Sequence, residues 1–164
     1  MAASPLNELA MFRLAGLDPA PFEALFALSD EALRACGIRR VRADADSGFP
    51  CRVSLVDARQ GEELLLLPWR HHDVDSPYQA AGPIYVRRGA VATELAPGEV
   101  PAYVTRRLIS LRAYDRDAMM LRAEALEGAE VGERLRQWFE DDAVAYVHLH
   151  NARPGCYSCM ALRA

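Results

Sequence analysis

The sequence predicts an α+β domain in which an antiparallel-dominated sheet of about six or seven strands carries two or three helices packed on it. Short alternating or wholly apolar stretches recur along the chain, and turns rich in Gly, Pro and Asp separate them. Helical spacing of apolar residues is confined mainly to residues 18–37 and 130–138. The 164 residues are 51% hydrophobic, which is enough for one core. We therefore expect a single domain over residues 1–164, with residues 1–10 as a disordered tail.

The first part of the chain is predicted to alternate between strands and one helical segment. Residues 12–17 alternate weakly, and Asp18-Pro19 then supplies a helix N-cap with proline in the first turn. Apolar residues at helical spacings continue as far as Gly37, which indicates one broken helix or two short ones. Three strands of a meander are expected next, over residues 38–42, 51–55 and 63–68.

The second part contains a long polar loop, further strands and the best helix. Residues 71–82 are polar and interrupted by Pro and Gly, so we expect a loop of functional length. Strands are expected over residues 83–87 and 108–114. Residues 119–126 have helical propensities but are closely bracketed by turn residues, so we favour a strand there. Residues 130–138 place their apolar side chains, Trp138 included, on one helix face that should join the core.

Two histidines and two cysteines lie within a dozen residues near the C-terminal end of the sequence. Residues 143–150 alternate as in a strand, so the rings of His148 and His150 share one face. The following turn should carry Cys156 and Cys159 back over the strand end. Nitrogen and sulfur donors of this kind suit tetrahedral zinc, so His148, His150, Cys156 and Cys159 are candidate zinc ligands.

The same residues have two other interpretations. Cys156 is a candidate catalytic thiol with His148 as acid or base, because a neighbouring thiol, histidine or Arg153 favours the thiolate. We then expect Cys156 to be alkylated faster than Cys36 or Cys51, which lie at apolar positions of the predicted elements. In the remaining interpretation the histidines make ordinary hydrogen bonds and the cysteines pack as small hydrophobic groups. The pattern leaves all three open.

A second histidine pair, His71-His72, is followed by Asp73 and preceded by Arg70. If the strands over residues 64–68 and 143–150 are parallel neighbours, the two pairs converge on one pocket. His71 or His72 should then lie within about 10 Å of His148, His150 or Cys156. The alternative is a solvated polar loop. The candidate ligand-binding residues of this small-molecule site are Arg52, Arg70, His71, His72, Asp73, Asn151 and Arg153.

The composition excludes several classes of function. All 19 basic side chains are arginine, which excludes Schiff-base chemistry, pyridoxal-phosphate attachment and the lysine-bearing phosphate loop. A net charge of −4 without a basic cluster predicts no nucleic-acid partner. Since the sequence has neither a secretory signal nor an apolar run of about 20 residues, we expect a cytoplasmic protein without a membrane segment. Its four cysteines should be thiols or metal ligands.

Several short motifs, taken in order, resemble a known family. They are Phe12-Arg-Leu, Phe49-Pro-Cys-Arg, Leu67-Pro-Trp-Arg, Ser76-Pro-Tyr, Gly82-Pro-Ile-Tyr-Val, Leu111-Arg-Ala-Tyr-Asp and the closing stretch from Asn151 to Cys159. From about Met11 to Arg163 the chain is similar to the small bacterial proteins grouped as domain of unknown function 1203. The resemblance implies a single-domain bacterial protein. It brings no established activity and therefore assigns no catalytic residue.

Two classes of function stay open on these observations. The first is a protein with a small-molecule site at the His-x-His and Cys-x-x-Cys cluster, either zinc-dependent or thiol-dependent. The second is a non-catalytic ligand-binding or interaction module in which the same residues are structural. The sequence decides neither whether the protein is an enzyme nor how many copies assemble.

Overall fold

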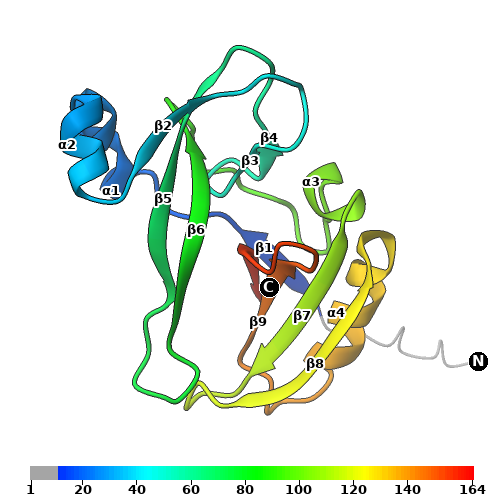
Figure 1. Cartoon of the computed structure of the whole chain (residues 1–164). Helices are drawn as coiled ribbons and strands as arrows, with labels where there is room; N and C mark the ends of the chain where they lie inside the picture. Colours follow the sequence, from blue (N-terminus) through cyan, green and yellow to red (C-terminus); the bar gives the residue numbers. More distant parts are fainter. Residues whose placement is uncertain (1–10) are drawn as a thin grey trace, which may run out of the picture.

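The computed structural model describes residues 11–164, and the tail predicted for residues 1–10 lies outside the described residues. Within them, ten strands form two five-stranded sheets, in the orders β1-β10-β9-β7-β8 and β2-β5-β6-β3-β4 (Figure 1). All strand pairs are antiparallel except β3 with β6. The predicted α+β class with antiparallel pairing is therefore confirmed, whereas a single sheet of six or seven strands with two or three helices is wrong, since residues 11–164 contain four short α-helices and two 3₁₀ helices.

The first sheet joins the N-terminal strand to the C-terminal half of the chain. Its strands are β1 (Phe12–Ala15), β7 (Leu108–Tyr114), β8 (Met120–Glu127), β9 (Tyr146–Asn151) and β10 (Tyr157–Arg163). Strand β8 confirms the choice of strand over helix for residues 119–126. Helix α4 (Val131–Phe139) follows the 3₁₀ helix η2 (Gly128–Glu130), as the apolar spacing predicts.

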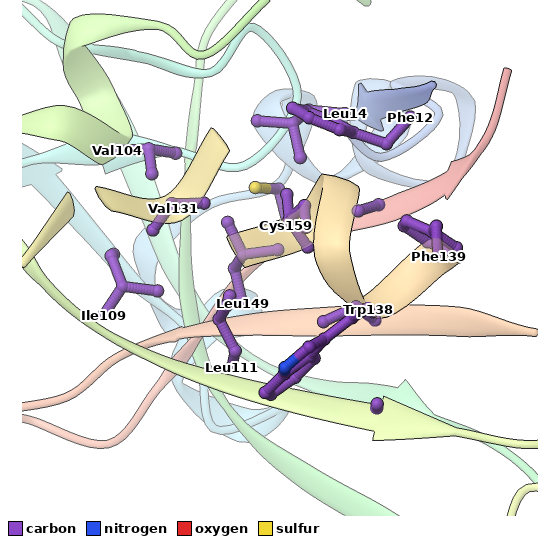
Figure 2. Close-up of a cluster of buried hydrophobic side chains, with 14 of the residues drawn as sticks. Phe12, Leu14, Val104, Ile109, Leu111, Val131, Trp138, Phe139, Leu149 and Cys159 are labelled. Carbon is purple, nitrogen blue, oxygen red and sulfur yellow. The ribbon is translucent and has the colours of Figure 1, made fainter. Parts of the chain in front are cut away.

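The larger core lies between the first sheet and helix α4. Trp138 and Val131 from the helix meet Leu111 of β7 and Leu149 of β9 there (Figure 2). Trp138 is thus a core residue, as predicted. Because Val147 and Leu149 enter this core, alternation along β9 directs His148 and His150 to the opposite face of the sheet.

The second sheet carries the N-terminal helices. Its strands are β2 (Arg39–Arg42), β3 (Pro50–Cys51), β4 (Val56–Asp57), β5 (Glu63–His72) and β6 (Ala80–Arg87). Helices α1 (Ala20–Glu23), η1 (Ala24–Ala27) and α2 (Asp30–Ala35) contribute Phe22, Phe26 and Leu33 to a separate core cluster with β5 and β6. A fourth α-helix, α3 (Ala102–Thr105), precedes β7. Among the described residues, no helix combines the length and the apolar character that crossing a bilayer requires.

Several expectations for the second sheet are wrong. The three strands do not form a meander, because β2 pairs with β5 and β3 pairs with β4 and β6, and β6 begins at Ala80 instead of residue 83. The strand expected over residues 51–55 stops at Cys51, and the chain then turns through Leu55, whose φ is 53°. Strand β5 continues to His72 instead of ending near Pro68, so His71 and His72 lie on a strand and not in a loop. The sequence does not predict this extension, because the polar residues that follow the apolar run have no strand-like alternation.

A close backbone crossing follows β1, where the chain leaves the first sheet. β1 pairs with β10, and the chain then passes directly over the backbone of Val53 on its way to the helices. A Cβ atom on Gly16 would lie 2.2 Å from the Val53 carbonyl oxygen, so this position needs glycine. The backbone N–H of Leu17 donates to the Arg52 carbonyl at 2.8 Å. Such a contact between distant segments leaves no periodic signal in the sequence.

Candidate functional site

All four histidines meet where the end of β5 faces β9, in a group that we call the histidine cluster (His71, His72, His148 and His150). The ring centroid of His71 lies 5.1 Å from that of His150 and 6.2 Å from that of His148. The His72 and His148 centroids are 4.8 Å apart. The two histidine pairs therefore lie well within the predicted separation of about 10 Å, and this prediction is confirmed.

The pairs converge for a different reason from the one expected. β5 and β9 are not parallel neighbours but belong to the two different sheets. The register of β5 against β6 shifts between Trp69 and His72. A β-bulge of this kind lets two consecutive side chains turn towards one side, which alternation alone forbids. Both His71 and His72 consequently reach the rings on β9.

Tyrosines enclose the cluster and fix one of its members. Tyr157 stacks on His71, with centroids 5.2 Å apart and an interplanar angle of 12°. The Nδ1 atom of His72 lies 2.7 Å from the Tyr78 carbonyl oxygen, and its Nε2 atom lies 2.7 Å from the Tyr146 hydroxyl. Since both nitrogens of His72 have partners, this ring ties the end of β5 to the first sheet.

The other three histidines carry buried ring nitrogens without a hydrogen-bond partner among residues 11–164. These atoms are Nδ1 of His71, Nδ1 of His148 and Nε2 of His150. His148 is 3% exposed and His150 is 1% exposed. The Nδ1 atom of His150 lies 3.0 Å from the Gly155 carbonyl oxygen, which can only accept, so Nδ1 carries the hydrogen and Nε2 keeps a lone pair. An unpaired buried polar atom costs roughly 1–3 kcal/mol.

These three rings are neutral imidazoles at pH 7. Burial lowers the pKa of His148 to about 3, and the neighbouring histidines and Arg112 lower it further. Burial also lowers the pKa of His150 to about 4, although its bond to Gly155 opposes that shift. The pKa of His71 is lowered by burial and by His72. Arg112 lies opposite His148 in the β7–β9 register and forms no salt bridge within the described part of the chain.

Cys159 does not belong to this cluster. Its side chain lies in the larger core beside Leu14 and Leu149 (Figure 2), and burial raises the pKa of its thiol to about 12. The register between β9 and β10 shifts after Tyr157, which pairs with His150, so that Cys159 pairs with Leu149. This bulge turns Cys159 to the opposite side of the sheet from Tyr157, into the core, whereas Cys156 lies before β10 and outside that core.

The predicted zinc set of His148, His150, Cys156 and Cys159 is therefore not assembled. Nor do any three or more His, Cys, Asp or Glu side chains in residues 11–164 stand ready around one point to hold a metal ion.

A cavity of about 480 Å³, which we call the arginine pocket, opens beside the turn that follows His150. Segments of both sheets form its walls, including Pro50 and Tyr85 from the second sheet and Leu108 from the first. Its polar lining residues are Arg52, Arg106, Arg107, Glu127, Asn151 and Arg153, and Cys156 also lines it. The predicted site residues Arg52, Asn151, Arg153 and Cys156 thus meet in one place.

Arg52 is the most deeply placed charge of the pocket, with 1% of its surface exposed. Its Nε donates to the Tyr157 carbonyl at 2.8 Å, its Nη1 to the Pro50 carbonyl at 2.6 Å and its Nη2 to the Cys156 sulfur at 3.2 Å. Within residues 11–164 it forms no salt bridge. A buried guanidinium without an acidic partner is costly.

The remaining charges make the pocket positive. Arg107 is already engaged, because its Nη2 donates to both carboxylate oxygens of Asp57, at 2.7 and 2.9 Å. Arg106 and Arg153 are exposed and form no salt bridge in the described structure. Glu127 is the acidic lining residue that opposes them. Arg106 and Arg107 were not predicted as site residues, since no sequence signal marks which arginines face a shared cavity.

Asn151 lies at the end of β9, on the inner wall of the arginine pocket. It is 5% exposed, and its Oδ1 atom is buried without a partner among the described residues. A buried amide oxygen of this kind is a ready acceptor for a hydroxyl or N–H group. The pocket therefore offers both positive charge and an unused acceptor.

The predicted pairing of Cys156 with His148 as nucleophile and base is not formed. Cys156 is partly exposed, and the hydrogen bond recorded at its sulfur comes from Arg52. In the described residues no hydrogen bond joins Cys156 to a histidine. Cys36, expected at an apolar position, is exposed instead because it lies at the C-terminal end of α2.

Arg70 and Asp73 stand apart from both groups. Their side chains are 60% and 69% exposed, and they form a salt bridge with each other at 3.3 Å. No recorded contact joins either residue to the histidine cluster, and neither lines the arginine pocket. The structure therefore does not bring Arg70 and Asp73 together with the other predicted site residues, and their charges satisfy each other in solvent.

A family model described as "Protein of unknown function (DUF1203)" matches residues 48–163. The match begins after the Phe12-Arg-Leu motif but includes every residue of the histidine cluster and of the arginine pocket. No curated protein and no solved structure matches the chain. Since the matched segment is well over half of the 164 residues, the chain belongs to the family of proteins of unknown function DUF1203.

Proposed function

We propose that the protein binds a small anionic molecule in the arginine pocket, with the carboxylate or phosphate group of that molecule directed towards Arg52. The observation that carries this proposal is the buried Arg52 guanidinium, which lines a cavity and has no acidic partner in residues 11–164. Guanidinium groups bind carboxylates and phosphates in a bidentate manner, and such charge-assisted bonds are strongest where water is excluded.

The size and lining of the pocket indicate what else the ligand carries. A cavity of about 480 Å³ falls within the roughly 300–1,000 Å³ of typical small-molecule sites. Tyr85, Leu108 and Pro154 supply apolar surface, and Asn151 supplies an unused acceptor. These features favour a ligand with an anionic group, an apolar or aromatic body and a hydroxyl or amine substituent.

Cys156 supports a thiol-dependent form of the same function. Its sulfur lines the pocket at 3.2 Å from the Arg52 guanidinium, which is the kind of electropositive, partly exposed setting in which reactive cysteines occur. An anionic ligand held by Arg52 would lie beside this thiol. In the alternative, non-catalytic form, the same contacts bind the ligand and Cys156 is a wall residue.

The proposal is tested by isothermal titration and thermal unfolding with phenyl phosphate and benzoate, using phenol and benzyl alcohol as neutral analogues. We expect the anions to bind and to raise the unfolding temperature, and the neutral analogues to have no effect. Arg106→Ala and Arg153→Ala, at exposed pocket positions, should weaken binding, whereas Arg116→Ala, at an exposed position outside the pocket, should not.

Two results would contradict the proposal. One is equal binding of the anionic and neutral compounds, which would show that the pocket charge is not used. The other is equal weakening by all three arginine variants, which would indicate a diffuse charge effect and no defined site.

A further inference from the structure

We propose that His71, His148 and His150 form a site for one divalent transition-metal ion of the zinc type, each histidine supplying one ring nitrogen. This site is separate from the arginine pocket, and it differs from the histidine–cysteine set that the sequence suggested. The inference goes beyond the proposed anion binding and does not depend on it.

The first observation is where the unsatisfied polar atoms lie. In residues 11–164, five buried side-chain nitrogen or oxygen atoms have no hydrogen-bond partner, and three of them are ring nitrogens of these histidines. The other two belong to Ser54 and Asn151. Buried polar groups are nearly always paired, so three orphan nitrogens in one cluster need an explanation. A bound metal ion accounts for them because neutral imidazole is a preferred ligand of zinc.

The second observation is the spacing of the rings. Three imidazoles bound to one zinc ion, with Zn–N bonds of about 2.0–2.1 Å, have centroids roughly 5 Å apart. The His71–His150 centroid distance of 5.1 Å already meets this requirement. The His71–His148 and His148–His150 distances, 6.2 and 6.3 Å, must each shorten by about 1 Å. As they stand, the three rings do not surround one point in residues 11–164. The proposal therefore requires His148 to move towards the other two rings when the ion binds.

The third observation concerns the hydrogen bonds made by the other ring nitrogens of the cluster. The Nδ1 atom of His150 donates to the Gly155 carbonyl, which leaves the Nε2 lone pair free. Metal-bound histidines typically use their second nitrogen in this way. His72 has partners on both nitrogens, Tyr78 and Tyr146, and is therefore excluded from the ligand set although it lies in the same cluster.

Three protein ligands leave a fourth position open for water or a substrate, as in catalytic zinc sites. Arg112 lies opposite His148 and forms no salt bridge among the described residues. The positive charge of Arg112 disfavours binding of the metal ion alone but favours an anion as its fourth ligand. We therefore expect the metal-bound site to hold a small anion more tightly than water.

The test uses the full chain without a histidine tag, because all four of its histidines belong to the cluster. The protein is stripped with a chelator and titrated with Co²⁺ and Zn²⁺. We expect one equivalent of Co²⁺ to give the intense visible bands of a four- or five-coordinate ion, without a sulfur-to-cobalt charge-transfer band. Nitrogen-15 spectra of the histidine rings in the unaltered chain should show Zn²⁺-induced shifts for His71, His148 and His150 and almost none for His72.

Variants provide the second measurement. His71→Asn, His148→Asn and His150→Asn should each weaken Co²⁺ binding by more than the roughly 10–100-fold caused by losing an outer-shell partner. His72→Gln should keep stoichiometric binding. The ring spectra need no variant, so the test stands even if a replacement prevents folding. Absence of stoichiometric binding, a cobalt–sulfur band, or equal shifts of all four rings would overturn the proposal.

Discussion

The guanidinium of Arg52 lies 3.2 Å from the sulfur of Cys156, although 104 residues separate the two along the chain. We propose that the reactivity of the thiol depends on this contact. We expect Arg52→Met, which removes the charge but keeps an apolar stem, to slow alkylation of Cys156 by iodoacetamide on the order of tenfold. Mass spectrometry of time points reports the rate at each cysteine.

The chain contains its own control for this prediction. Cys36 is exposed and lies outside the arginine pocket, so its alkylation rate should be unchanged by Arg52→Met. Equal slowing at both cysteines would indicate a general effect of the substitution. An unchanged rate at Cys156 would show that the guanidinium does not influence the sulfur.

The accessible thiols can be counted directly. Cys51 and Cys159 are buried and Cys156 is partly exposed. In a Cys36→Ser chain we therefore expect one thiol to react with a disulfide reagent in the native state and two more to react only in denaturant. The absorbance of the released thiolate gives both numbers. Rapid reaction of three thiols without denaturant would contradict the described burial.

Acid should destabilise the metal-free protein through the histidine cluster. In the folded chain His148 and His150 have pKa values of about 3 and about 4, below the ordinary value of 6.5. Between these values the unfolded chain binds more protons, so the free energy of unfolding is fully retained above about pH 6.5 and falls as the pH drops towards 4. Each histidine contributes a slope of up to about 1.4 kcal/mol per pH unit in that window.

Denaturant unfolding at several pH values, with chelator present, measures this slope. His150→Asn should reduce the slope between about pH 5 and 6 by up to about 1.4 kcal/mol per pH unit, because Asn does not titrate. If the variant and the unaltered chain show the same dependence on pH, burial does not hold His150 neutral.

The backbone crossing at Gly16 should be intolerant of any side chain. We expect Gly16→Ala to lower the free energy of unfolding by roughly 2–4 kcal/mol, because its Cβ would overlap the Val53 carbonyl oxygen. Gly82→Ala is the matched control, since nothing lies within 4 Å of a Cβ there and its φ is not positive. Urea unfolding of both variants provides the comparison, and equal stabilities would show that the crossing is loose.

Local periodicity predicted those parts of the fold whose neighbours lie nearby in the sequence. The alternation along β9 correctly placed His148 and His150 on one face and Leu149 in the core. The spacing of apolar residues predicted α4 nearly to the residue. Both patterns arise because one face of the element is buried, and this burial is visible in the spacing of apolar residues within a short segment.

The other features of the fold and of the site depend on contacts between distant segments, which leave no local pattern in the sequence. At Gly16 the chain leaves the first sheet and crosses a segment more than 30 residues away. The bulge after Tyr157 turned Cys159 into the core, although its spacing from Cys156 suggested a shared metal. Arg106 was indistinguishable from other surface arginines, because its place in the pocket follows from how the two sheets pack.

We expect the bond from Arg52 to Tyr157 to form late during folding. It closes a loop of 105 residues, and contacts of such separation form late because the chain must first give up a large conformational entropy. A ribosome must synthesise the chain beyond Tyr157 before the inner wall of the arginine pocket exists. Ligand capture should therefore report on completed assembly, so a fluorescent anion in a refolding experiment would be bound only after the two sheets have docked.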